Sequence, residues 1–222
     1  MKRRTFGRFY LVFTLVFCPA STVFAAPAAD AHKTPTKTYY AGGKLKSEWI
    51  YNASGTASHR LYYETGPLKL QREYKGGVPE GESREYYENG AIKTQWSYSG
   101  GKLNGPLLEY AESGALVTRI PIVNGEAEGP AVQYYPNGKQ RKIFFYRDGK
   151  REGAAVVSYP SGRKKADLNY AGDQLQGTMR KFYEDGSLEE ETNYIAGELN
   201  GPARKFYEGG ADRKSTRLNS SH

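Results

Sequence analysis

The side chains that could carry out covalent or metal chemistry are few and far apart in this sequence. His59 is the one histidine of the central body, because His32 and His222 lie near the two ends. The single cysteine, Cys18, falls in the first segment of the chain, so no second thiol or imidazole accompanies His59 at a metal-binding spacing. The run Glu189-Glu190-Glu191 indicates a solvated strand rather than a paired acid and base. We therefore expect no enzymatic activity, no metal and no cofactor, and a surface position for His59.

Non-covalent binding is the chemistry that the remaining residues favour. Tyrosine and tryptophan offer apolar area with a polar handle, which suits a protein interface, although most of the 19 tyrosines should pack within the fold. Basic residues beside them suit an anionic partner such as a lipid headgroup or an acidic glycan, although a solvated strand face is the simpler interpretation. The candidate partner-binding residues are Trp49, Trp96, Tyr98, Phe144, Tyr146, Arg163, Lys164 and Lys165.

A repeat of 24 residues organises the chain that must position these side chains. Its marker is the last glycine of a Tyr-Tyr-x-x-Gly element. Gly43 fits the same frame, although its distance of 23 residues to the next marker leaves the first unit one residue short. The repeat-defining glycines are Gly66, Gly90, Gly114, Gly138, Gly162, Gly186 and Gly210.

Each unit predicts a β-hairpin. After the marker glycine, apolar and polar residues alternate, as from Ile92 to Tyr98, which is typical of a half-buried strand. A Gly-x-x-x-Gly segment such as Gly101 to Gly105 follows. The second strand of a unit ends at an aromatic pair and a strong hairpin signal, such as the Asn89-Gly90 that precedes Ile92. We therefore predict an all-β fold, an elongated array of about seven hairpin units in one long antiparallel sheet. About fifteen strands would make this sheet roughly 70 Å long.

The N-terminal end does not carry the repeat. Residues 1–25 combine basic residues with an apolar run and predict a secretory signal peptide, cleaved between Ala25 and Ala26. An outer-membrane lipoprotein attached through Cys18 is the alternative, although Phe17 is bulky where a small residue is expected. We expect an exported protein, periplasmic or secreted. Residues 26–38, rich in Ala, Pro, Thr and Lys, predict a disordered leader before the repeat body at 39–211.

The C-terminal segment 212–222 matches no repeat unit and resembles a translated sequencing adapter. We expect it to lie outside the fold, and the natural chain to continue beyond Ala211. The net charge of the whole sequence is +8, but seven bases and one acid lie in residues 1–25 and 212–222, which leaves +2 for the chain between them. Binding of nucleic acid is therefore not expected.

Units such as Tyr86 to Lys93, joined to the next through Gly101 to Pro106, resemble the MORN-repeat variant of bacterial proteins named YwqK-family antitoxins. The resemblance covers Tyr39 to about Gly210. It implies an extended hairpin array that binds a protein partner, and the antitoxin name implies a toxin as that partner. Because a signal peptide directs the chain out of the cytoplasm, an envelope toxin or an immunity role is the form consistent with export. The alternatives are an envelope scaffold that binds lipid or glycan, and a docking module for a catalytic domain beyond Ala211.

Overall fold

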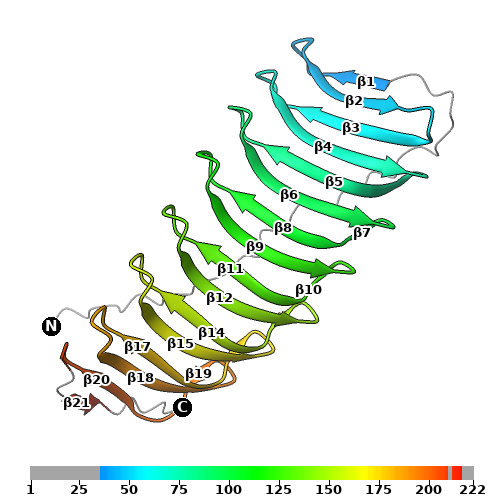
Figure 1. Cartoon of the computed structure of the whole chain (residues 1–222). Helices are drawn as coiled ribbons and strands as arrows, with labels where there is room; N and C mark the ends of the chain where they lie inside the picture. Colours follow the sequence, from blue (N-terminus) through cyan, green and yellow to red (C-terminus); the bar gives the residue numbers. More distant parts are fainter. Residues whose placement is uncertain (1–35, 210–211, 217–222) are drawn as a thin grey trace.

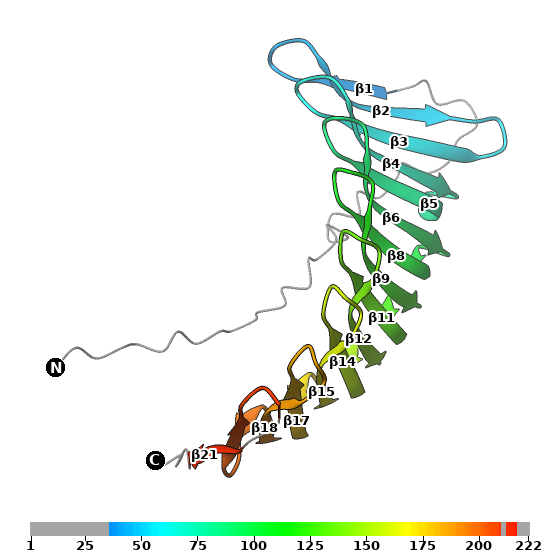
Figure 2. The ribbon, with the colours of Figure 1, turned by 60° about the vertical axis from the view of Figure 1, so that its left-hand side comes forward.

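The computed structural model describes residues 36–209 and 212–216, which form one sheet of 21 strands. Neighbouring strands are antiparallel and follow one another along the sheet in chain order (Figure 1). Turned by 60°, the same strands still form a single layer, with a row of loops along one edge (Figure 2). The predicted all-β array of hairpins is confirmed. None of the described residues belongs to a helix long and apolar enough to cross a membrane.

The strands fall into three groups along the array. The first units use β1 (Thr36–Tyr39), β2 (Leu45–Tyr51), β3 (Thr56–Tyr62), β4 (Leu68–Lys75), β5 (Val78–Tyr86) and β6 (Ile92–Ser99). The middle units use β7 (Lys102–Leu103), β8 (Gly105–Tyr110), β9 (Leu116–Val123), β10 (Glu126–Ala127), β11 (Gly129–Tyr134), β12 (Gln140–Arg147), β13 (Lys150–Arg151) and β14 (Gly153–Ser158). The last units use β15 (Lys164–Ala171), β16 (Gln174–Leu175), β17 (Gly177–Phe182), β18 (Leu188–Ile195), β19 (Glu198–Leu199), β20 (Ala203–Phe206) and β21 (Asp212–Thr216).

The two end strands lie in segments that the sequence set apart from the repeat body. β1 begins at Thr36, within the expected leader 26–38, and pairs with β2. β21 lies within the expected tail 212–222, and its backbone pairs with β20. Main-chain pairing requires no particular side chains, so the edge of a sheet accepts a segment that does not follow the repeat pattern. The expected signal segment with Ala25 and Ala26, and the marker Gly210, lie outside the described residues.

Three-residue loops join the strands along one edge. The backbone N–H of Tyr87 donates to the carbonyl of Ala91 at 2.8 Å, and the N–H of Gly90 donates to the carbonyl of Tyr87 at 3.0 Å. Gly90 has a φ of 86°, the left-handed conformation that the last residue of such a loop requires. The Asn89-Gly90 pair therefore fills the last two positions of this loop.

Two-residue turns join the strands along the other edge, and each is followed by a bulge. Gly100 and Gly101 both have positive φ and connect β6 to β7. Beyond the break at Asn104, the register between β6 and its partner strand shifts by two residues. In the first unit the loop after Asn52 has three residues and β3 has no bulge. The first unit thus has one residue more in its loop and lacks the two residues of the bulge, which makes it one residue shorter than the others.

One face of the sheet carries most of the aromatic side chains, and we call it the aromatic face. Side chains alternate between the two faces along a strand, and residues directly opposite on neighbouring strands share a face. The pairings therefore place two adjacent rows on this face. The central row holds Trp49, His59, Arg72, Ser83, Trp96, Leu107, Ile120, Ala131, Phe144, Ala155, Leu168, Met179 and Thr192. The second row includes Tyr51, Tyr74, Tyr98, Ile122, Tyr146, Tyr170 and Tyr194.

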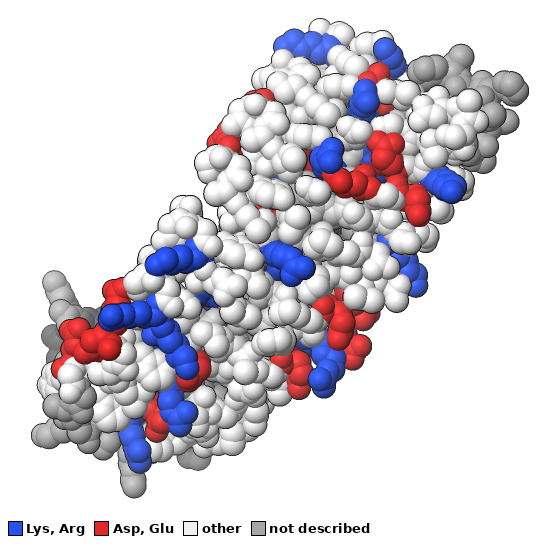
Figure 3. All heavy atoms as spheres, in the orientation of Figure 1, with Lys and Arg blue, Asp and Glu red and all other residues white. Residues whose placement is uncertain are grey.

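The opposite face carries charges that are largely paired. Glu48 lies 3.7 Å from both Lys37 and Arg60, and the Arg180 guanidinium lies 2.9 Å from Glu191. Figure 3 shows one side of the molecule, on which charges of both signs lie interspersed along the array from one end to the other. Glu48 is buried, whereas exposed pairs such as that of Arg180 and Glu191 contribute little to stability and are typical of a solvated surface.

A ladder of tyrosine hydroxyl groups links successive units, and we call it the tyrosine ladder. The Tyr87 hydroxyl donates to the backbone carbonyl of Tyr110 at 2.8 Å. The same bond, at 2.7–2.9 Å, is made by Tyr40, Tyr63, Tyr135, Tyr159 and Tyr183. Ala111 occupies the corresponding position after Tyr87 and has no hydroxyl group. A repeat array depends on contacts between neighbouring units. The hydroxyl groups of these tyrosines therefore stabilise the fold and are not left over to bind a ligand.

We expect the Tyr87→Phe variant to lower the free energy of unfolding by about 0.5–1.5 kcal/mol, because the Tyr110 carbonyl loses its partner while the ring remains. The Ala111→Tyr variant should raise it by a similar amount by supplying the missing hydroxyl. Urea unfolding followed by circular dichroism measures both. Tyr39→Phe is the matched control, since Tyr39 is 58% exposed and lies outside the ladder. Equal midpoints for Tyr87→Phe and Tyr39→Phe would show that the ladder does not stabilise the fold.

Candidate partner-binding face

The largest buried side chains of the aromatic face gather over β2 to β6. Trp96 and Tyr74 are only 1% and 2% exposed, and Tyr98 and Leu70 are buried beside them. Leu61 and Leu103 pack against this group. We call the six ring-bearing and charged residues at its centre the aromatic-arginine cluster. They are Trp49, His59, Arg72, Tyr74, Trp96 and Tyr98.

The rings of the cluster are stacked across neighbouring strands. The indole of Trp49 lies parallel to the imidazole of His59, with ring centroids 4.2 Å apart and planes 8° apart. The ring of Tyr74 is tilted against Trp49 at 4.8 Å. The register places His59 opposite Trp49. It also places Tyr74 of β4 opposite the small Ala57 of β3, so that Tyr74 reaches Trp49 of β2 across β3. Such cross-strand aromatic contacts stabilise a sheet.

Arg72 is the one cationic member of the cluster, and no carboxylate balances it among the described residues. Its guanidinium carbon lies 6.0 Å from the Trp96 ring centroid and 5.4 Å from that of Tyr98. Arg72 is 5% exposed and takes part in no ion pair within the described chain. Arg151, also on this face, differs because its Nε donates to Asp173 at 2.9 Å. A buried charge without a partner is costly, so the charge of Arg72 does not stabilise the fold.

Four polar atoms of this region are buried without a hydrogen-bond partner in the structure. They are Arg72 Nε, Tyr74 Oη, Ser83 Oγ and Trp96 Nε1. Ser83 lies opposite Arg72 on one side and opposite Trp96 on the other, so the four groups share one small area. All four can donate a hydrogen bond. Buried donors are satisfied in most folded proteins, so four unsatisfied ones in one place make this area the candidate binding site of the aromatic face.

His59 is buried, and its expected surface position was wrong. It is 8% exposed and lies within β3, not in a turn. The first unit lacks the bulge of the others, so the strand runs on without interruption and brings His59 between Trp49 and Arg72. Burial of the imidazole, and then the charge of Arg72, lower the pKa of His59 to about 4. The ring is therefore neutral at neutral pH.

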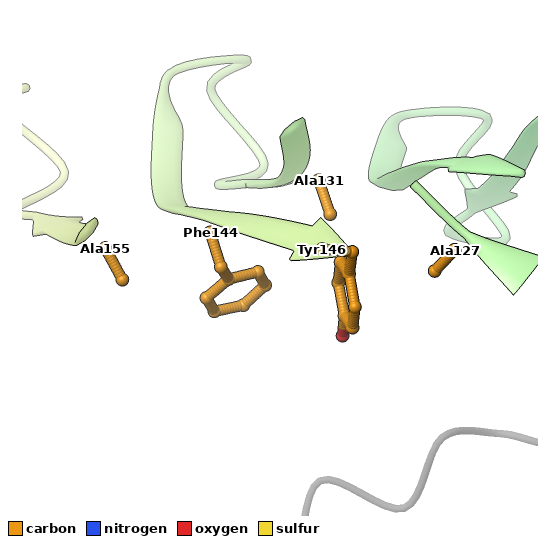
Figure 4. Packing of buried hydrophobic residues seen from close by; sticks show 5 residues of the cluster. All are labelled: Ala127, Ala131, Phe144, Tyr146 and Ala155. Carbon is orange, nitrogen blue, oxygen red and sulfur yellow. The ribbon is translucent and has the colours of Figure 1, made fainter. Parts of the chain in front are cut away.

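Phe144 and Tyr146 form a second group on the same face, further along the array. They project side by side from β12 and are flanked by Ala127, Ala131 and Ala155 (Figure 4). The small alanines on the neighbouring strands leave room for the two large rings, which meet edge to face at 6.4 Å. This group packs as a core with no buried charge among its members. All five aromatic candidates from the sequence thus lie on one face, in two groups.

The three basic candidates do not form one patch. The Arg163 guanidinium donates to the Glu184 carbonyl at 2.8 Å, and Lys164 pairs with Asp167 at 3.2 Å. Lys165 lies over the Tyr159 ring instead, with its Nζ 5.1 Å from the centroid. Arg163 and Lys164 line an open depression of about 380 Å³ together with Phe182 and Gly186. These contacts favour the solvated-strand interpretation over an anion-binding patch.

Arg72, Tyr74, Ser83 and His59 were absent from the residues predicted to bind a partner. The repeat frame held a signal for one of them, because Arg72 stands 24 residues before Trp96, in a column that is otherwise mainly apolar. The unsatisfied donors could be found only from the structure, which gives the register of the strands and the burial of each side chain. Among the described residues, no three His, Cys, Asp or Glu side chains gather as a metal-binding group.

Comparison of the sequence with models of known protein families gives one match. Four segments of the chain match the model of the MORN repeat variant: residues 35–53, 79–99, 127–148 and 175–196. The four matches together cover 84 of the 222 residues. The last three matches begin 48 residues apart, which is two of the 24-residue units. The first two MORN-variant segments contain Trp49 and Trp96, and the third contains Phe144 and Tyr146. No curated protein matches the chain.

Solved structures give a much weaker likeness to this array of hairpins. A Staphylococcus aureus TarM mutant in complex with Fondaparinux, α-GlcNAc-glycerol and UDP is 9% identical with a TM-score of 0.26 over 55% of this chain, and a second TarM structure is also 9% identical with a TM-score of 0.26 over 59%. The Photorhabdus luminescens Tc holotoxin pore is 14% identical with a TM-score of 0.25 over 84%. This chain spans only 12–22% of those chains.

Proposed function

We propose that this chain is a non-enzymatic repeat protein that presents its aromatic face to a protein partner. One observation carries the proposal: four buried donor groups without partners gather among Trp49, Trp96 and Tyr74 on a single-layer sheet. Tryptophan, tyrosine and arginine dominate the energetic centres of protein interfaces. The described residues form a single-layer sheet in which Trp96, Tyr74 and Arg72 are at most 5% exposed, so a partner that contacts them displaces neighbouring side chains. The MORN-variant repeats support a binding module of this kind.

Export is the second part of the proposal. It rests on the basic residues and apolar run of segment 1–25, with cleavage between Ala25 and Ala26. An exported binding protein that resembles YwqK-family antitoxins suits a toxin of the cell envelope as its partner, in an immunity role. Expression with a C-terminal tag, fractionation and N-terminal sequencing test this part. A mature chain that begins at Ala26 supports export, and a chain retained in the cytoplasm with its first 25 residues contradicts it.

Binding is tested by capture of a partner from the envelope fraction of the source cells, followed by mass spectrometry. The Trp96→Ala variant should lose at least about tenfold in affinity for the captured protein, as interface tryptophans commonly do. The matched control is Phe145→Ala, because Phe145 is an exposed aromatic residue on the opposite face. Equal affinity of the two variants for the captured protein would show that the aromatic face is not the binding surface. Turnover of a captured small molecule would contradict the non-enzymatic role.

A further inference from the structure

We propose that the aromatic-arginine cluster binds one carboxylate group of a partner polypeptide, with Arg72 as its counter-ion. This inference rests on the proposed protein-binding function and names the group that the aromatic face recognises. Three independent properties of the cluster carry it: its charge, its hydrogen-bonding groups and its apolar border.

The cluster carries one positive charge, which a ligand with one negative charge would neutralise. Arg72 is cationic, His59 is neutral at neutral pH, and the described residues place no carboxylate within ion-pair distance of Arg72. Glu85 on β5 lies on the same face, but its carboxylate is already 3.0 Å from the Lys93 ammonium. A carboxylate would balance the guanidinium, whereas a phosphate monoester carries about two charges and would leave one unbalanced.

The hydrogen-bonding groups require an acceptor. Arg72 Nε and Trp96 Nε1 can only donate, and the hydroxyl groups of Ser83 and Tyr74 can donate as well. An ionised carboxylate only accepts hydrogen bonds and has about four lone-pair sites, so it complements four donors. A neutral amide side chain would bring two donors of its own toward a cationic centre. The four donors therefore favour a carboxylate over the corresponding amide.

Part of the border of the cluster is apolar. Leu61 and Leu103 pack against Leu70, Trp96 and Tyr98, and Arg72 lies against two aromatic rings. Burial beside leucine strengthens the attraction between the guanidinium and a carboxylate, because water screens it less. Apolar residues that flank an acidic residue in a polypeptide would cover this border. A strongly hydrated ion in solution would not.

The test uses the full chain and its two tryptophans, Trp49 and Trp96, which are the only ones in the sequence and both belong to the cluster. Their fluorescence is titrated with the capped peptide Ala-Leu-Glu-Leu-Ala, and with peptides that carry glutamine or phosphoserine in place of glutamate. We expect saturable binding of the glutamate peptide and at least about tenfold weaker binding of the glutamine peptide. Arg72→Gln should weaken binding of the glutamate peptide about tenfold to hundredfold.

The matched control is Arg84→Gln, which removes the same charge from the opposite face. It should leave binding of the glutamate peptide unchanged. Equal binding of the glutamate and glutamine peptides, tighter binding of the phosphoserine peptide, or equal losses in the two arginine variants would each overturn the carboxylate assignment. So would the absence of a saturable change up to millimolar peptide. If a captured partner depends on Trp96 but the peptide titration fails, protein binding stands and the carboxylate assignment falls.

Discussion

The Arg72→Met variant is expected to be more stable than the natural chain. Methionine keeps an unbranched stem against the rings of Trp96 and Tyr98 but carries no charge. Burial of an unpaired ion costs several kcal/mol, and a desolvated contact with aromatic rings returns only about 2 kcal/mol. We therefore expect the free energy of unfolding of the N-terminal units to rise by about 1–3 kcal/mol. Urea unfolding followed by tryptophan emission measures it, since both tryptophans lie beside Arg72.

A control for this prediction exists on the same face. Arg151 also lies over an aromatic ring, 4.4 Å from the Tyr170 centroid, but its Nε is bonded to Asp173. Arg151→Met should not stabilise the chain, because it leaves the Asp173 carboxylate without its partner. If Arg72→Met lowers the urea midpoint as Arg151→Met does, then Arg72 is a structural residue. A stabilising Arg72→Met would instead be typical of a binding residue that is kept at the expense of stability.

The fold was predictable from the sequence because glycine and alternation specify it locally. Gly90 and Gly101 adopt positive φ where their spacing predicts turns, and the strand from Ile92 to Tyr98 alternates as its burial does. The position of each side chain along the array also follows from the repeat, since Trp96 and Phe144 stand two 24-residue units apart and lie in one row of the sheet. The bulge at Gly105 was not predicted, since a second glycine after a turn is compatible with a longer loop as well.

The candidate site was predictable only in its aromatic part. Trp49 and Trp96 stand out by residue type, whereas Arg72 and Ser83 become notable only when their burial and missing partners are known. His59 was misplaced because the short first unit looked like a degenerate turn, although the missing bulge lengthens the strand that holds it. Lys164 and Lys165 are adjacent in sequence yet lie over different rings, those of Phe182 and Tyr159, so the basic run of the sequence is no single patch in the fold.

The stability of the N-terminal units is expected to fall in mild acid because of His59. The pKa of this imidazole is about 4 in the folded chain, below its ordinary value of 6.5, so the unfolded chain binds more protons between these two values. Stability is therefore fully present above pH 6.5 and is lost as the pH falls toward 4. The loss reaches about 2 kcal/mol at pH 5 and about 3 kcal/mol at pH 4. Urea midpoints measured by tryptophan emission between pH 7 and 5 follow it.

The His59→Phe variant isolates this effect, because a phenyl ring still stacks on Trp49 but does not titrate. Its midpoint should change little between pH 7 and 5, where most carboxylates remain ionised. A fall as large as that of the natural chain would assign the pH dependence to other groups. Arg72→Met should shrink the fall without removing it, since burial is the larger cause of the low pKa and the charge of Arg72 the smaller. If the fall vanishes in Arg72→Met, the charge of Arg72 dominates, and a bound carboxylate would then raise the pKa of His59 as it neutralises that charge.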